Sequence, residues 1–163
     1  MQASYADFVT LIQRIGEDFG ARVVFEKGEG PEKLVAGEAP NSYPKGAEYA
    51  DKGYFVASID YGKRGRIWPT PERGLIVYLK TTMIPELSMT AKGYKGANLD
   101  FPDQSTTDQF FDEEQFEAYR ELGYRTACSV VEDLQLEEAF KLGMRPDWKS
   151  TFEPMLKRDD LDS

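Results

Sequence analysis

The stretch that decides the fold is FPDQSTTDQFFDEEQFEAYRELGYRTA, which runs from Phe101 to Ala127. In this stretch a loop rich in Ser, Thr and Asp leads into a segment rich in aromatic residues. Asp112 followed three residues later by Gln115 predicts a helix start, in which the carboxylate accepts a backbone N–H and the Gln amide reaches back. We expect this main helix to continue to about Asp133.

The apolar positions of the main helix recur at spacings of three and four residues, which places them on one face directed at a core. They are Phe116, Tyr119, Leu122, Thr126, Ala127, Val130 and Leu134. Charged residues occupy the opposite face, namely Glu117, Glu121, Arg125 and Glu132. A docked surface helix with a capped start accounts for this pattern without any functional role.

The whole chain predicts an α/β fold of the α+β type, with long loops and a small, mostly antiparallel three-stranded sheet packed by two main helices. Helical spacing of apolar residues predicts the first helix over residues 5–19, with Ser4 as its cap and Gly20 as its stop. Runs of β-branched and aromatic residues predict strands over 22–27, 54–61 and 75–82. The expected order of elements is therefore α-β-β-β-α.

The length of 163 residues is that of one domain. We expect a single α/β domain over residues 1–143 and a polar C-terminal tail over 144–163. Residues 28–53 are rich in Gly, Pro, Lys and Glu and predict a long loop that either is partly disordered or carries a short helix near 47–50. Further short helices are expected within 84–99 and over 136–142.

Composition excludes several classes of function. The net charge of −9 disfavours nucleic acids and anionic membrane surfaces as partners. The chain has no His, which removes the Ser-His-Asp and Cys-His arrangements, and its single Cys128 is expected to pack as a small hydrophobe. No apolar run approaches the roughly 20 residues that span a bilayer. We expect a cytoplasmic protein without cofactors.

Two basic features are candidate binding sites. The loop GKRGRIWPTPERG over residues 62–74 places Arg66 and other basic residues around Trp68, a composition typical of binding hot spots. Lys80 at a strand end is a candidate for binding an anion such as phosphate. The alternatives are an ordinary solvated loop and a solvent-facing lysine.

The loop before the main helix offers polar candidates. Asp103, Ser105, Thr106 and Asp108 are candidate binding residues, although nothing basic is placed to activate a hydroxyl as a nucleophile. A twelve-residue window has oxygen-bearing side chains at positions 1, 3, 5 and 12, as in calcium loops. These positions hold Asp103, Ser105, Thr107 and Glu114. An acidic helix start stabilised by the helix dipole explains the same residues.

The order of residues in the opening stretch resembles the C-terminal signature FPHxSTADQFFDExQFExYRxLG of bacterial patatin-like phospholipase family proteins. The matching positions are Pro102, Ser105, Thr106, Asp108, Gln109, Phe110, Phe111, Asp112, Glu113, Gln115, Phe116, Glu117, Tyr119, Arg120, Leu122 and Gly123. The chain departs from the signature at Asp103, where the family has His, and at Thr107, where it has Ala. Residues 12–26 and 74–82 are similar to further passages of the family.

The resemblance implies a role in lipid metabolism without catalysis by this chain. The family's GxSxG nucleophile turn, DG[GA] motif and glycine-rich oxyanion loop do not occur in this sequence. We therefore expect a non-catalytic C-terminal domain of a patatin-like lipid acyl hydrolase, a hydrolase-associated domain that supports the preceding catalytic domain or binds lipid or a protein partner. One alternative is a stand-alone protein-interaction module, and another is an enzyme with an acid-base pair among Asp60, Glu72, Asp103 and Asp108.

Overall fold

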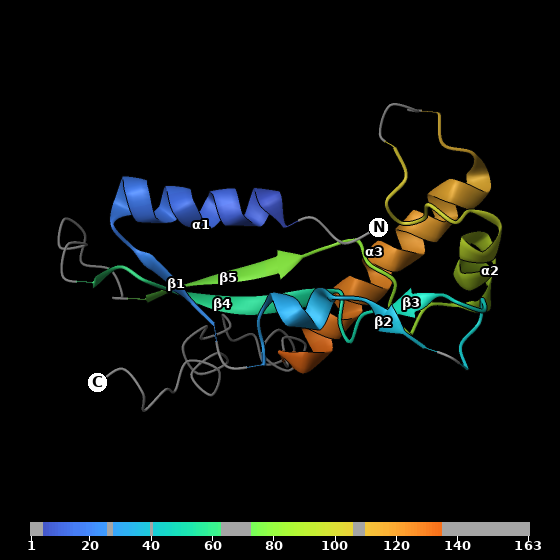
Figure 1. The fold of residues 1–163 in the computed structure, drawn as a ribbon, viewed down its shortest axis with the longest axis horizontal. Helices are drawn as coiled ribbons and strands as arrows, with labels where there is room; N and C mark the ends of the chain where they lie inside the picture. Colours follow the sequence, from blue (N-terminus) through green and yellow to red (C-terminus); the bar gives the residue numbers. More distant parts are fainter. Residues whose placement is uncertain (1–4, 26–27, 40, 63–72, 106–109, 135–163) are drawn as a thin grey trace, which may run out of the picture.

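The structure is a computed structural model that describes residues 5–25, 28–39, 41–62, 73–105 and 110–134 (Figure 1). Within these ranges it confirms the expected fold class, with helices and a small antiparallel sheet joined by loops. The helices are α1 (Ala6–Phe19), the 3-10 helix η1 (Pro31–Leu34), α2 (Met89–Ala97) and α3 (Glu113–Asp133). The strands are β1 (Arg22–Val24), β2 (Gly37–Glu38), β3 (Glu48–Tyr49), β4 (Tyr54–Asp60) and β5 (Arg73–Leu79).

The three-stranded sheet has the order β1-β4-β5, and both pairs of neighbours are antiparallel. Phe55 lies opposite Tyr78 in the register, so both rings are on the same face of the sheet. Helix α1 covers this face (Figure 1) and inserts Phe8, whose ring centre lies 4.9 Å from that of Phe55. Together with the fully buried Leu34 of η1, these residues form the first core.

A second core joins α2 and α3 at the end of the molecule away from β1 (Figure 1). Phe101 is its centre and is 0% exposed. Its ring meets those of Tyr94 and Tyr119 edge-on at 5.3 and 4.9 Å between centres. The aromatic residues of the opening stretch thus serve in part to fasten the connection between α2 and α3.

The predicted start and end of the main helix are confirmed, with one correction at the cap. The backbone N–H of Gln115 donates to the Asp112 carboxylate at 2.7 Å, and α3 ends at Asp133. The Gln115 side chain does not reach back; it donates instead to the Gln104 side chain at 3.2 Å. This bond explains how a polar residue is buried against α2.

The predicted core face of the main helix was partly wrong. Leu122, Thr126 and Leu134 are buried as expected, but Phe116 is 56% exposed and Ala127 is also exposed. Gln115, Ala118, Leu122 and Thr126 form the buried stripe. The stripe is rotated because α2 and Phe101 pack beside Ala118 and Leu122, which turns Phe116 outward.

Smaller differences concern the ends of elements. The helix expected near 47–50 is wrong, because Glu48 pairs with Glu38 in the β2-β3 ribbon. Gly20 ends α1 as predicted, with a left-handed φ of 62° and its N–H donated to Gly16. Ser4, the helix expected over 136–142 and the tail lie outside the described residues. Of the helices in the described ranges, none combines the length and hydrophobicity needed to span a bilayer.

Candidate functional site

Several candidate residues lie outside the described ranges. These are Arg66, Trp68, Thr106, Thr107 and Asp108. Lys80 is described, and its ammonium lies 5.9 Å from the centre of the Tyr5 ring. Its backbone N–H donates to Gly53 at 3.0 Å. Lys80 therefore links the residue before α1 to the segment after β5.

The predicted calcium loop is only partly described. The backbone N–H of Asp103 closes a turn onto Asp100 at 2.7 Å, and the side chains of Asp103, Ser105 and Glu114 are exposed. Within the described residues, no three His, Cys, Asp or Glu side chains are grouped to hold a metal ion. The structure thus brings together no calcium ligands from this loop in the part it describes.

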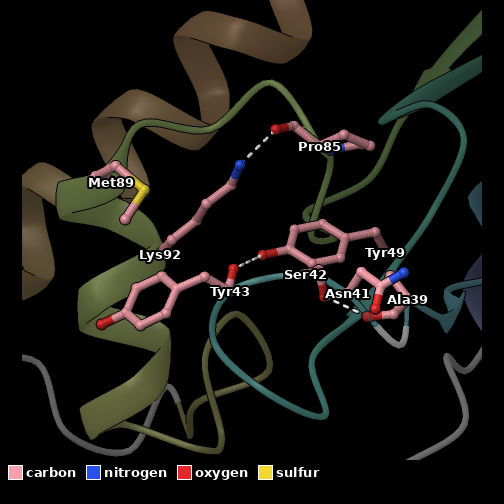
Figure 2. A pocket seen from close by; sticks show the side chains of 8 residues that line it. All are labelled: Ala39, Asn41, Ser42, Tyr43, Tyr49, Pro85, Met89 and Lys92. Carbon is pink, nitrogen blue, oxygen red and sulfur yellow. Dashed lines mark hydrogen bonds between the residues drawn. The ribbon is translucent and has the colours of Figure 1, made fainter.

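A pocket with a volume of about 380 Å³ lies between the loop that joins β2 to β3 and the first turns of α2 (Figure 2). It is lined by Ala39, Asn41, Ser42, Tyr43, Tyr49, Pro85, Met89 and Lys92. The loop is held by its own hydrogen bonds, since the Tyr49 hydroxyl donates to the Tyr43 carbonyl at 2.5 Å and the Ser42 hydroxyl donates to Ala39 at 2.6 Å.

Two glycines of α2 face the loop. A Cβ atom on Gly96 would lie 3.4 Å from the Pro44 ring, and one on Gly93 would lie 4.0 Å from the Tyr43 hydroxyl. Both distances are ordinary van der Waals contacts, so a methyl group fits at either position without moving the loop.

Lys92 carries the one charge among the residues that line the pocket. Its ammonium donates to the Pro85 carbonyl at 2.6 Å and lies 5.7 Å from the centre of the Tyr49 ring. Partial burial raises the pKa of Tyr49, so this phenol is neutral and acts as a hydrogen-bond donor. The pocket combines aromatic walls with a positive charge.

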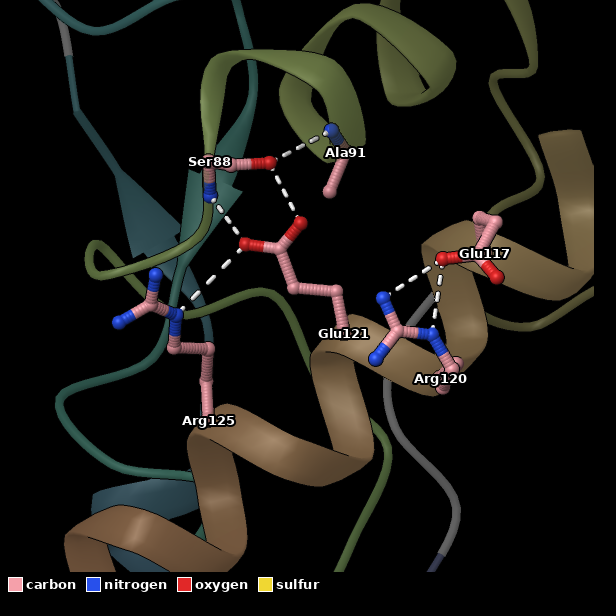
Figure 3. A network of polar contacts seen from close by, with 6 residues as sticks. All are labelled: Ser88, Ala91, Glu117, Arg120, Glu121 and Arg125. Carbon is pink, nitrogen blue, oxygen red and sulfur yellow. Dashed lines mark hydrogen bonds and ion pairs between the residues drawn. The ribbon is translucent and has the colours of Figure 1, made fainter.

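A network of polar contacts joins α2 to α3 (Figure 3). The Glu121 carboxylate accepts from the Ser88 backbone N–H at 2.8 Å and from the Ser88 hydroxyl at 2.5 Å. Arg125 lies 3.6 Å from the same carboxylate. Burial by itself raises the pKa of Glu121, but the bonds from Ser88 and the charge of Arg125 outweigh it and lower the pKa. The prediction that Glu121 lies on the outer face of the helix is therefore wrong, because its carboxylate faces the start of α2.

A second network ties the end of α3 to the start of β4. The Asp133 carboxylate accepts from Lys52 and from the Tyr54 hydroxyl, both at 2.5 Å. Burial and the neighbouring Asp133 raise the pKa of Tyr54 well above its usual value. This phenol stays protonated and donates to Asp133, which links β4 to the end of α3.

Aromatic side chains are exposed where α3 begins. We define the aromatic face as Phe110, Phe111 and Phe116, which are 92%, 49% and 56% exposed. Phe111 precedes the helix cap and Phe116 follows in the next turn, positions that lie together at a helix start. The carboxylates next to these residues in the sequence, here called the acidic rim, are Asp112, Glu113, Glu114 and Glu117, all exposed.

Comparisons of this chain with protein-family models, curated proteins and solved structures give no match. The family resemblance therefore rests on the residues of the signature and stays a prediction. Sequence reasoning did not find the pocket, because its two sides are more than 35 residues apart along the chain. The closest signal was the pair Gly93 and Gly96, whose spacing on one helix face allows a close neighbour.

Proposed function

We propose that this chain is the non-catalytic C-terminal domain of a patatin-like lipid acyl hydrolase, and that its aromatic face docks on the preceding catalytic domain. The signature supports this proposal because its residues divide into two groups. One group has a role inside this domain: Asp112 caps α3, and the Tyr119 hydroxyl donates to the Pro102 carbonyl at 2.8 Å. The other group is the aromatic face, of which Phe111 also stacks on the Tyr119 ring at 5.9 Å between centres and still remains about half exposed.

The observation that carries the proposal is the exposure of Phe111 and Phe116 within the matched signature. Both side chains are about half exposed, although large aromatic residues are mostly buried in folded proteins. Exposed apolar side chains that are grouped together are typical of interaction sites. A signature that keeps them is explained if another surface covers them in the complete protein.

Charge favours a protein surface as that partner. The exposed acidic rim alternates in sequence with the aromatic face, and the chain carries a net charge of −9. The complementary surface is an apolar hollow edged by Lys and Arg. An anionic lipid surface is repelled by the same charges.

The described carboxylates give no support to the rival enzyme class. Asp60 pairs with Arg22 at 3.5 Å and accepts the Gly62 N–H at 2.8 Å, which are the contacts of a strand end. Asp103 is exposed in a turn. Glu72 and Asp108 lie outside the described residues. A stand-alone interaction module uses the same aromatic face, so experiment has to separate it from the domain we propose.

The first test is the intact mass of the native protein, captured with an antibody against this chain. A native species tens of kilodaltons larger is the expected result. A species of this chain's own mass of 18.5 kDa would refute the hydrolase-domain proposal and leave the interaction module.

The second test measures binding of this domain to the separately expressed catalytic part by calorimetry. The variant Phe111→Ser with Phe116→Ser should weaken binding by about tenfold or more, as expected for aromatic hot spots. The matched control is Val9→Ser with Leu11→Ser, which changes two exposed apolar residues of α1 and should leave binding unchanged. Equal effects of the two double variants would contradict docking through the aromatic face. Binding to neutral lipid vesicles in place of the protein would contradict it as well.

A further inference from the structure

We infer that the pocket between the β2-β3 loop and α2 is a binding site for a small organic anion with a flat apolar body. The simplest members of this class are aryl carboxylates and aryl phosphates. The inference is independent of the docking proposed above, because the pocket uses none of the residues of the aromatic face.

The volume and the apolar walls of the pocket determine the size and the apolar character of the ligand it can hold. Its volume of about 380 Å³ is at the lower end of the range of roughly 300–1,000 Å³ typical of small-molecule sites. Tyr43 and Tyr49 contribute rings, and Pro85 and Met89 add apolar surface (Figure 2). Tyr43 and Met89 are also largely exposed, so a ligand can enter from solvent.

The polar groups of the pocket favour a ligand that accepts hydrogen bonds. The carbonyls of Ala39, Tyr43 and Pro85 already accept bonds from Ser42, Tyr49 and Lys92. The ammonium of Lys92 has three N–H donors, and the bond to Pro85 uses one of them. Asn41, on the loop side of the pocket (Figure 2), adds an amide that can donate or accept. Lys92 therefore keeps two N–H donors for a ligand, whereas the hydroxyls of Ser42 and Tyr49 have already donated their hydrogens.

The positive charge of Lys92 favours a negatively charged ligand. Among the described residues Lys92 forms no ion pair with a carboxylate, and no Asp or Glu lines the pocket. The Tyr49 ring and the Pro85 carbonyl hold the ammonium at the wall, so little side-chain freedom remains to be lost on binding. The pocket is a local positive site on an acidic protein.

The test is a titration of the full chain, followed by amide NMR shifts, with benzoate, phenyl phosphate and neutral benzamide. Benzoate or phenyl phosphate should shift resonances of residues 39–49 and 85–92, and the tighter of the two identifies the preferred head group. Lys92→Met should weaken binding by at least about tenfold, because it removes a charge-assisted bond. Lys92→Arg should retain binding.

Lys45→Met is the matched control, since Lys45 is exposed in the same loop but does not line the pocket. Its affinity should stay within about twofold of the parent chain, given screening of exposed charges. Tyr43→Ala removes an exposed ring from the wall of the pocket and should also weaken binding. This variant provides the test if Lys92→Met does not fold. The inference is overturned if benzamide binds as well as the anions, if neither anion shifts these residues, or if Lys45→Met weakens binding as much as Lys92→Met.

Discussion

Replacing Glu121 by Gln tests how α2 is held against α3. The Glu121 side chain is 18% exposed and accepts two hydrogen bonds from Ser88 (Figure 3). Gln has nearly the same shape, but it loses the charge and presents an NH₂ group toward a donor. Hydrogen bonds to a charged group each contribute about 1.5–3 kcal/mol. Because one acceptor oxygen remains in Gln, we expect a loss of about 2–3 kcal/mol at pH 7.

The loss should depend on pH in a defined direction. The pKa of Glu121 in the folded protein is below its ordinary value of 4.5. The carboxylate therefore contributes stability that is fully present above about pH 4.5 and is lost as the pH falls through the lower folded pKa. The difference between the parent protein and Glu121→Gln should shrink in that acidic window.

Urea unfolding followed by circular dichroism measures these free energies between pH 3 and 7. The matched control is Glu117→Gln on the same helix, whose carboxylate pairs with Arg120 at 2.6 Å on the exposed surface. Solvent screens that pair, so the control should change stability little. The reasoning is refuted if Glu121→Gln costs no more than Glu117→Gln at pH 7, or if its cost does not fall in acid.

Three other substitutions test the cores by the same unfolding measurement. Phe101→Ala removes a fully buried ring and should cost about 3–5 kcal/mol; a cost below 1 kcal/mol would show that Phe101 does not anchor the second core. Thr126→Val replaces a buried hydroxyl that has no partner in the described structure and should stabilise the protein by about 1 kcal/mol, whereas a loss would indicate that the hydroxyl is satisfied. Gly53→Ala places a Cβ atom 2.5 Å from the Thr126 hydroxyl and should cost about 1–3 kcal/mol. Adding Thr126→Ala should recover part of that cost, and strict additivity of the two changes would contradict the clash.

Features that depend on neighbouring residues were predictable. The capping carboxylate of Asp112 and the left-handed Gly20 act within one helical turn, so their effect is visible in a short window of sequence. The antiparallel pairing of β4 with β5 followed from two apolar runs in adjacent segments. The short helix near 47–50, one of two alternatives for that loop, is wrong because β3 pairs with β2, about ten residues earlier in the chain.

The sites were less predictable than the elements. Asp103, Ser105 and Glu114 remain exposed around the helix start, while the pocket is built around Tyr49 and Lys92, which no sequence pattern singled out. These two residues become neighbours only when α2 packs beside the β2-β3 loop. Contacts between distant segments leave little trace in the local pattern.

The sequence by itself determined the type of the main elements and the ends of the main helix, because capping, helical spacing and strand-forming runs are local properties. The strand expected over 75–82 instead spans Arg73–Leu79. Only the tertiary structure decided which side of α3 is buried, since the apolar spacing allows several rotations and the packing of α2 selects one. That choice buries Gln115 and turns Phe116 outward. It also brings Glu121 to Ser88. Which side of α3 is buried depends on the segment that packs against it, and that segment is α2, which lies earlier in the chain.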